Sequence, residues 1–214
     1  MDAVLDHLPE LVRGLRTTVE LTLLAFAGAL CLGVVVAALR VSPVPVLRAA
    51  GTAYVEGLQN VPLLVLLVLA VFGLPEIGVQ AGLFVTAVVV IAVYEAAYIA
   101  EAVRSGINTV AVGQAEAARA LGLTFTQSLA YVILPQALRT VVQPIGSIAI
   151  ALTMNTSLAA AVGVVELTAA TNRVNLAEAQ PIPIFVGAGL AYMALAAVAG
   201  LVTGILERRL AIVR

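Results

Sequence analysis

The sequence predicts an all-α membrane protein, and three observations support this. Of the 214 residues, 62% are hydrophobic and only 11% are charged, whereas a soluble domain is about 25% charged. So few charges could not cover a folded surface in water. Several uncharged intervals are long enough to cross a bilayer, which takes about 20 apolar residues as a helix. Between two of these intervals lies a more polar stretch with signals that end one helix and start the next.

The composition excludes several classes of function. With a net charge of −1, the chain has no large basic surface for nucleic acid. Cys31 is the only cysteine and His7 the only histidine, so neither an internal disulfide nor a histidine-rich metal site is expected. Neither a P-loop nor a Gly-x-Ser-x-Gly motif is present. We therefore expect no metal or other cofactor in this chain.

Six uncharged intervals are candidates for membrane spans. They are Leu21–Leu39, Gly57–Pro75, Ile77–Tyr94, Ala120–Leu138, Thr140–Val165 and Ala179–Leu206. The fourth interval differs from the others because its first half is polar and a proline lies near its end. We interpret it as a surface loop, which leaves five spans; a sixth span is the alternative.

Local signals in the fourth interval indicate two short helices joined by a bend. Gly122 suits the left-handed conformation that ends a helix. Thr124 and Gln127 have the spacing of a capping box, in which each side chain bonds a free backbone N–H of the next helix. Pro135 breaks that second helix or opens the following one. The predicted helices cover 113–121 and 124–132.

The chain is then one transmembrane domain, residues 1–214, with a predicted interfacial helix at 1–16 and a loop at 113–135. The predicted spans are about 17–40, 52–74, 78–103, 136–156 and 182–207. The acidic start of the chain does not resemble a cleaved signal peptide. With five spans, the side with more arginines carries Arg40, Arg48, Arg104, Arg119, Arg139, Arg208, Arg209 and Arg214. The other side has Arg13, Arg16 and Arg173, so the N-terminus is expected outside and the C-terminus in the cytoplasm.

Polar residues at or within the spans are candidates for a transport pathway. An ionisable group in a span is costly and suggests a cavity or a partner. Uncharged polar groups can line a pathway or simply hydrogen-bond neighbouring helices, and both interpretations stay open. Glu166 is either part of an outer gate, a contact for another protein, or an exposed acid. The candidates are Glu56, Gln59, Asn60, Glu95, Thr153, Asn155, Thr156, Ser157 and Glu166.

Several separated motifs resemble one family, the permease subunits of polar amino-acid ABC importers. They are Tyr98-Ile-Ala-Glu-Ala-Val-Arg-Ser-Gly-Ile107, Gly113-Gln-Ala-Glu-Ala-Ala-Arg-Ala-Leu-Gly122, Ile133-Leu-Pro-Gln-Ala-Leu-Arg139, Asn60-Val-Pro-Leu63 and Thr156-Ser-Leu158. The second is similar to the family's EAA motif. The stretches Arg40-Val-Ser-Pro-Val44 and Arg104-Ser-Gly-Ile-Asn-Thr-Val110 most resemble glutamate-uptake permeases of actinobacteria.

This resemblance implies a five-span type I importer permease that works by alternating access. It implies a pair of permeases, for which a related second chain is favoured over a second copy. It also implies paired ATPases that hold ATP and Mg, and an extracytoplasmic binding protein. Residues 113–135 would be the coupling loop that docks on the ATPase. Its residues would be Gln114, Glu116, Ala117, Ala118, Arg119, Gly122 and Pro135.

The substrate and some roles stay open. Glu116 would contact the ATPase, although a solvated helix glutamate is the alternative, and Arg119 could pair with it across one turn. Met154 and Gln59 stand where similar permeases often carry a cation, which leaves the choice among glutamate and related amino acids undecided. A non-transporting scaffold or an intramembrane enzyme is the alternative. The enzyme is disfavoured because the only aspartates are at positions 2 and 6.

Overall fold

The computed structural model describes residues 2–210, and its regular structure is helical throughout that range. Arg214, one of the arginines used to orient the chain, lies outside the described residues. Short π-helical turns occupy Leu69–Gly73 and Leu129–Ile133, and a 3-10 turn occupies Thr156–Val162. The α-helices are α1 Asp2–Asp6, α2 Leu8–Arg40, α3 Pro45–Gln59, α4 Leu63–Val68, α5 Leu74–Glu76, α6 Leu83–Asn108, α7 Val112–Ala120, α8 Phe125–Ser128, α9 Leu134–Asn155, α10 Leu167–Glu178 and α11 Pro181–Leu210.

Four long helical segments and one bent pair have the length and apolar character of membrane spans. The four segments are Leu8–Arg40, Leu83–Asn108, Phe125–Val162 and Pro181–Arg209. The fifth candidate combines Pro45–Gln59 with Leu63–Glu76, which meet at 98°. The span predicted at 52–74 coincides with this bent pair: its first part lies in α3, and the rest lies in α4 and the π-helical turn that follows it. Pro62 has no N–H to donate and keeps the residue before it out of the helical region, so the helix stops at this point.

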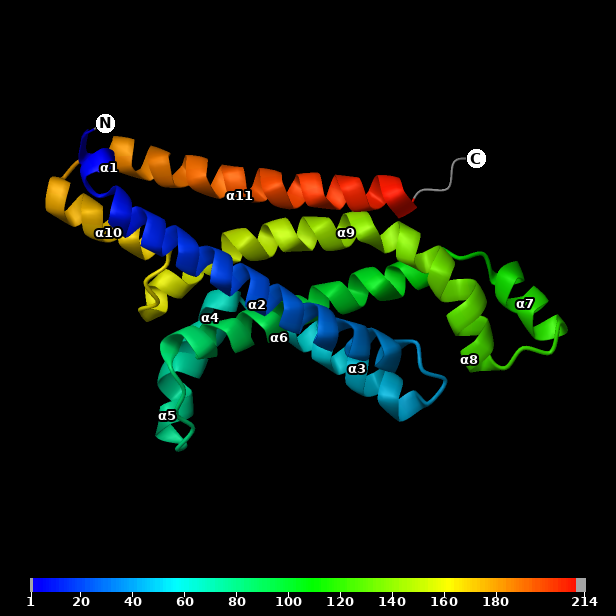
Figure 1. Ribbon diagram of the computed structural model, residues 1–214. Coiled ribbons are helices and arrows are strands. Elements are labelled where there is room, and N and C mark those ends of the chain that lie inside the picture. Colours follow the sequence, from blue (N-terminus) through cyan, green and yellow to red (C-terminus); the bar gives the residue numbers. More distant parts are fainter. Residues whose placement is uncertain (1, 211–214) are drawn as a thin grey trace.

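The main packing contact is between α2 and α6, which cross at the centre of the bundle (Figure 1). Small residues allow this close approach: a Cβ added to Gly33 would lie 2.7 Å from Cγ2 of Ile99. One apolar core joins this pair to α4 and α9, with Leu21, Leu67 and Ile91 fully buried. Burial of these side chains therefore holds the bent pair against the long helices.

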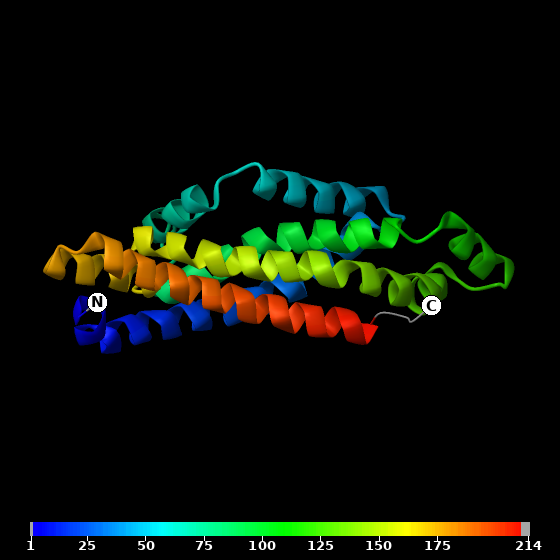
Figure 2. The same cartoon turned by 90° about the horizontal axis from the view of Figure 1, so that it is seen from above.

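The bundle is elongated and its two ends differ (Figure 2). The N-terminus and α10 lie at one end, which we call the α10 end. At the opposite end, α7 and α8 extend beyond the long helices, and we call this the α7–α8 end. The sites described below are located relative to these two ends.

The predicted interfacial helix at 1–16 is wrong in its extent. Only Asp2–Asp6 forms a separate helix, and α2 already begins at Leu8. Leu11 and Gly14 of α2 are buried, and a Cβ at Gly14 would lie 2.8 Å from that of Ala170 in α10. Because α10 covers this segment, residues 8–16 extend the first long helix instead of lying apart from it.

The other three predicted spans differ from the observed helices mainly at their ends. The span predicted at 78–103 corresponds to α6, which starts later and continues to Asn108. The span at 136–156 corresponds to α9, which the 3-10 turn extends at its far end. The span at 182–207 lies within α11.

Candidate functional site

The bend after α7 has the structure that the sequence predicts. Gly122 has a φ of +84°, a conformation that glycine adopts without strain. The N–H of Gly122 donates to the carbonyl of Arg119 at 2.9 Å, and that of Leu123 donates to Ala118 at 3.1 Å. This pair of bonds is a Schellman motif, which satisfies the free carbonyls at the end of a helix.

The start of α8 is capped as predicted. The Gln127 N–H donates to Thr124 Oγ1 at 3.3 Å, and the Thr124 N–H donates to Gln127 Oε1 at 2.9 Å. Two back-to-back caps therefore fix the bend through local hydrogen bonds alone. The second helix does not break at Pro135, as one alternative expected. It continues from α8 through the π-helical turn Leu129–Ile133, and Pro135 lies in the first turn of α9.

Most residues predicted to couple to a partner are exposed on α7 and around the bend. The exposed ones are Gln114, Glu116, Ala117, Arg119, Gly122 and Pro135. Ala118 is instead 3% exposed, on a helix that packs against α8 and the π-helical turn. It therefore packs within the chain and does not share the exposed surface of the other six. No ion pair joins Glu116 to Arg119 within the described residues, so that predicted pairing is wrong.

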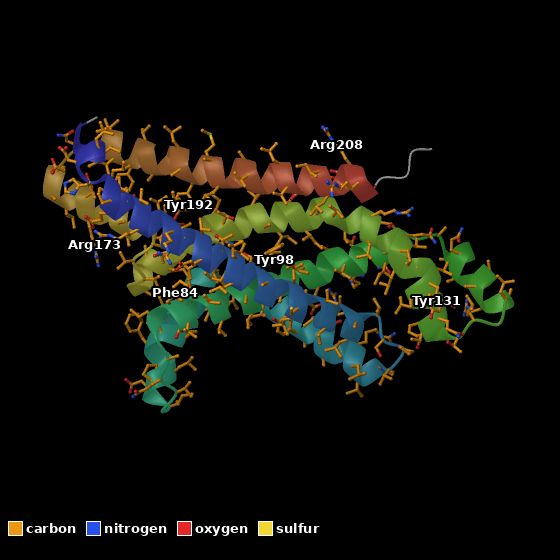
Figure 3. The ribbon with its side chains drawn as sticks, in the orientation of Figure 1. Phe84, Tyr98, Tyr131, Arg173, Tyr192 and Arg208 are labelled. Carbon is orange, nitrogen blue, oxygen red and sulfur yellow. The ribbon has the colours of Figure 1, made fainter. Side chains whose placement is uncertain are left out.

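A second candidate site is a cavity of about 380 Å³ between α6 and α9. Glu95 is only 3% exposed, and its Oε1 accepts a hydrogen bond from Asn155 Nδ2 at 2.7 Å. Tyr94 and Tyr98 lie on the same side of α6, with their hydroxyls 3.0 Å apart. Tyr98 is near the middle of the bundle (Figure 3). The remaining lining side chains are Ser147, Ile148 and Ala151 of α9.

The polarity of this cavity favours a cationic group. No arginine lines it, and no described residue donates to the second carboxylate oxygen of Glu95. An ionised carboxylate in a span is costly unless it is paired or hydrogen-bonded. An ammonium group entering the cavity could supply both the charge and the missing donors. The hydroxyls and the Asn155 amide could hold a carboxylate through neutral hydrogen bonds.

The other predicted pathway residues do not join this cavity. Glu56 and Asn60 are exposed, and Asn60 Nδ2 donates to the Glu56 carbonyl. Gln59 Nε2 donates to the Ala97 carbonyl at 3.4 Å, which links α3 to α6. The hydroxyls of the other three bond carbonyls three or four residues earlier in the chain. These three are Thr153, Thr156 and Ser157.

Glu166 is a structural residue of the α10 end. It is completely buried, so the expectation of an exposed acid is wrong, and so is that of a contact for another protein. Its carboxylate caps α10 by accepting from the N–H groups of Thr168 and Ala169, both at 2.9 Å. Tyr192 of α11 donates to it at 2.6 Å and Thr18 of α2 at 3.4 Å. This one side chain therefore ties three helices together.

Sequence reasoning missed three polar residues of the cavity: Tyr94, Tyr98 and Ser147. A positional signal existed for each. Tyr94 and Tyr98 are four residues apart on one helix, and Ser147 and Asn155 are eight apart, so each pair shares a helix face. An inspection of helix faces around Glu95 and Asn155 would have found them.

Comparison with known proteins decides the family. Residues 29–212 match the family model of the binding-protein-dependent transport system inner membrane component. The chain belongs to this family. Over 170 residues, 74% of this chain and 75% of the relative, it is 40% identical to the glutamate transport system permease protein GluC of Corynebacterium efficiens. Over 205 residues, 96% and 95% of the two chains, it is 34% identical to the probable glutamine ABC transporter permease protein GlnM of Bacillus subtilis.

A solved structure supports the same assignment. The crystal structure of an amino acid ABC transporter with histidines matches with a TM-score of 0.90 at 28% identity, over 96% of both chains. The protein is therefore a permease subunit of an amino-acid ABC transporter, with the type I importer fold that the sequence predicts. Permease subunits of this family are not enzymes themselves. Membership of this family implies, in general, a binding protein and an ATPase as partners.

Proposed function

We propose that this permease carries glutamate or a closely related polar amino acid into the cytoplasm. The observation that carries the proposal is the cavity at Glu95, where a buried carboxylate with one free oxygen faces tyrosine, serine and asparagine side chains. The carboxylate suits the α-ammonium group common to all amino acids. The neutral donors suit a polar side chain. Relatives whose names specify glutamate and glutamine support this class of substrate.

Coupling to ATP hydrolysis would occur at the α7–α8 end. The Schellman motif and the capping box hold the bend, while Gln114, Glu116 and Arg119 remain exposed on α7. A stiff, exposed two-helix segment suits docking in a groove of a partner, because little ordering is needed on binding. ATP and Mg would be held by that partner ATPase, whose closure would move α7 and α8 and switch the pathway between its two access states.

The arginine distribution supports an orientation for this mechanism. The arginines near the α7–α8 end outnumber those near the α10 end, so the former would be cytoplasmic and the N-terminus extracytoplasmic. A binding protein would then deliver its amino acid at the α10 end. A second permease, a related chain in preference to a copy, would complete the pathway. The protein would thus be a multi-pass component of the bacterial cytoplasmic membrane.

Reconstitution of the complete transporter tests the substrate. Proteoliposomes with ATP inside and the cognate binding protein outside should accumulate labelled glutamate. Unlabelled glutamate, glutamine, aspartate, cystine and arginine are then added in turn as competitors. Competition by glutamine that exceeds competition by glutamate would move the assignment to glutamine. No ATP-dependent uptake of any of these amino acids would overturn the proposal.

A single substitution tests the coupling role. Glu116→Ala should lower uptake, and ATPase activity should no longer be stimulated by the loaded binding protein. Glu207→Ala is the matched control, because Glu207 is also an exposed acid but belongs to α11. Normal stimulated hydrolysis with normal uptake in Glu116→Ala would exclude a coupling role for this residue.

A further inference from the structure

A deep apolar groove runs between α2, α9 and α11, separate from the cavity at Glu95. Its volume is about 550 Å³, within the range of about 300–1,000 Å³ typical of ligand sites. Phe26 of α2, Ala149 of α9 and Ala199 of α11 are among its lining residues. Toward the α7–α8 end, α2 and α11 diverge (Figure 1), and Leu138 of α9 and Leu206 of α11 are the lining residues of their helices nearest that end.

The groove offers no free hydrogen-bond donor to a ligand. Its three hydroxyl-bearing residues are Thr22, Thr153 and Thr203, and each donates to the carbonyl four residues earlier at 2.8 Å. All other lining residues are apolar. The occupant must therefore be apolar along this length, because a polar group would lose its hydration without compensation.

The groove and the polar cavity lie on opposite sides of α9. The groove is lined by Leu138, Ile145 and Ala149, whereas the cavity is lined by Ser147, Ala151 and Asn155. At 100° per residue, these two sets of positions face in roughly opposite directions. If a second permease closes the polar cavity, the groove faces away from it toward lipid.

Positive charge lies next to the lining residues nearest the α7–α8 end. Arg209 follows the lining residue Leu206 by three positions and so shares its helix face, and Arg139 directly follows the lining residue Leu138. Both arginines are exposed, and neither forms an ion pair within the described residues. Arg208, by contrast, points away from the bundle (Figure 3).

We propose that this groove is a binding site for an anionic phospholipid. An acyl chain lies along α2, α9 and α11, and the phosphate headgroup lies between Arg139 and Arg209. The apolar length and the basic end match the two parts of such a lipid. A bound lipid fills the gap between α2 and α11 and can hold α11 at a fixed distance from the first span.

Native mass spectrometry of the assembled transporter tests the site. The transporter is purified from nanodiscs of palmitoyl-oleoyl phosphatidylglycerol mixed equally with palmitoyl-oleoyl phosphatidylcholine. We expect one phosphatidylglycerol retained per permease. Arg209→Gln should lower its occupancy about fivefold, the equivalent of about 1 kcal/mol for one arginine beside a headgroup. Arg208→Gln is the matched control and should leave occupancy unchanged.

Filling the groove with a larger side chain independently tests whether an acyl chain binds there. Ala199→Phe should lower retention of both lipids, whereas Ala197→Phe, an exposed position outside the lining, should not. With benzoylphenylalanine in place of Ala199, irradiation should yield an adduct with the mass of a phospholipid. An adduct with a polypeptide would overturn the proposal in favour of a protein contact. Equal retention of the two lipids, or equal effects of the Arg208 and Arg209 variants, would overturn it as well.

Discussion

Two buried carboxylates on different helices of this permease have opposite environments. Glu166, at the α10 end, is fully buried and receives hydrogen bonds from two backbone N–H groups, Tyr192 and Thr18. Glu95, in the middle of α6, is almost as buried but receives one hydrogen bond, from Asn155. Glu166 is enclosed by protein, whereas Glu95 lines a cavity.

This difference shows that burial alone does not separate a structural acid from a transport residue. A carboxylate has room for about four hydrogen bonds. Where protein donors fill that room, the group stabilises the fold and has nothing left to offer a ligand. Where most of it is unfilled and a cavity adjoins, a ligand can supply the missing donors.

The largest expected effect is on stability, from Glu166→Ala. The substitution leaves two backbone N–H groups and the Tyr192 hydroxyl without their acceptor in a buried site. We expect the free energy of unfolding to fall by about 3–5 kcal/mol, as when one partner of a buried charged network is removed. Thermal unfolding of the purified transporter measures this, with Glu76→Ala as the control at an exposed acid. A melting temperature equal to that of the control would remove the distinction between the two carboxylates.

For Glu95→Gln we expect the opposite result: uptake falls, whereas stability does not. The amide oxygen can still accept from Asn155, so packing is retained, but the negative charge is lost. Loss of one charge-assisted bond of about 1.5–3 kcal/mol to a substrate ammonium should lower uptake about 10- to 100-fold. The melting temperature should stay the same or rise, because an unpaired buried charge is removed. Unchanged uptake would exclude Glu95 from the pathway, and a large drop in melting temperature would make it structural.

Removal of single donors sharpens the comparison. Tyr192→Phe deletes one hydroxyl that donates to Glu166 and contacts Thr168. We expect a loss of stability of about 1.5 kcal/mol, at the low end for a bond to a charged group because three donors remain. Tyr98→Phe, at the cavity, should change stability less and uptake more. If thermal unfolding and uptake respond alike in both variants, the two sites do not differ in the way their geometry indicates.

The parts of the fold that depend on hydrogen bonds between nearby residues could be predicted from the sequence. Gly122, Thr124 and Gln127 predict the bend between α7 and α8 because the bonds that form it span five residues or fewer. The burial of Glu166 between three helices could not be predicted, because its partner Thr18 is 148 residues away and no sequence pattern indicates that the two residues meet. Pro62 ends a helix through local geometry, but the 98° bend also depends on the packing of α3 and α4 against α6, which joins residues far apart in the chain.

The smallest expected effect comes from a change in the bend that positions Glu116. Unlike the two buried carboxylates, Glu116 is exposed, and its position depends on the caps of the neighbouring helix ends. Gly122→Ala places a side chain on a residue with a φ of +84°, which should cost about 1 kcal/mol. No atom within 4 Å of the added Cβ would oppose it, so the cost is conformational. We expect ATP-driven uptake to fall severalfold while the melting temperature of the bundle is unchanged. Gly122→Asn should be milder, because asparagine tolerates the left-handed region better than alanine. Equal uptake in the alanine variant and the wild type would show that the bend can relax without loss of coupling. Glu116 would then act independently of the caps that hold its helix.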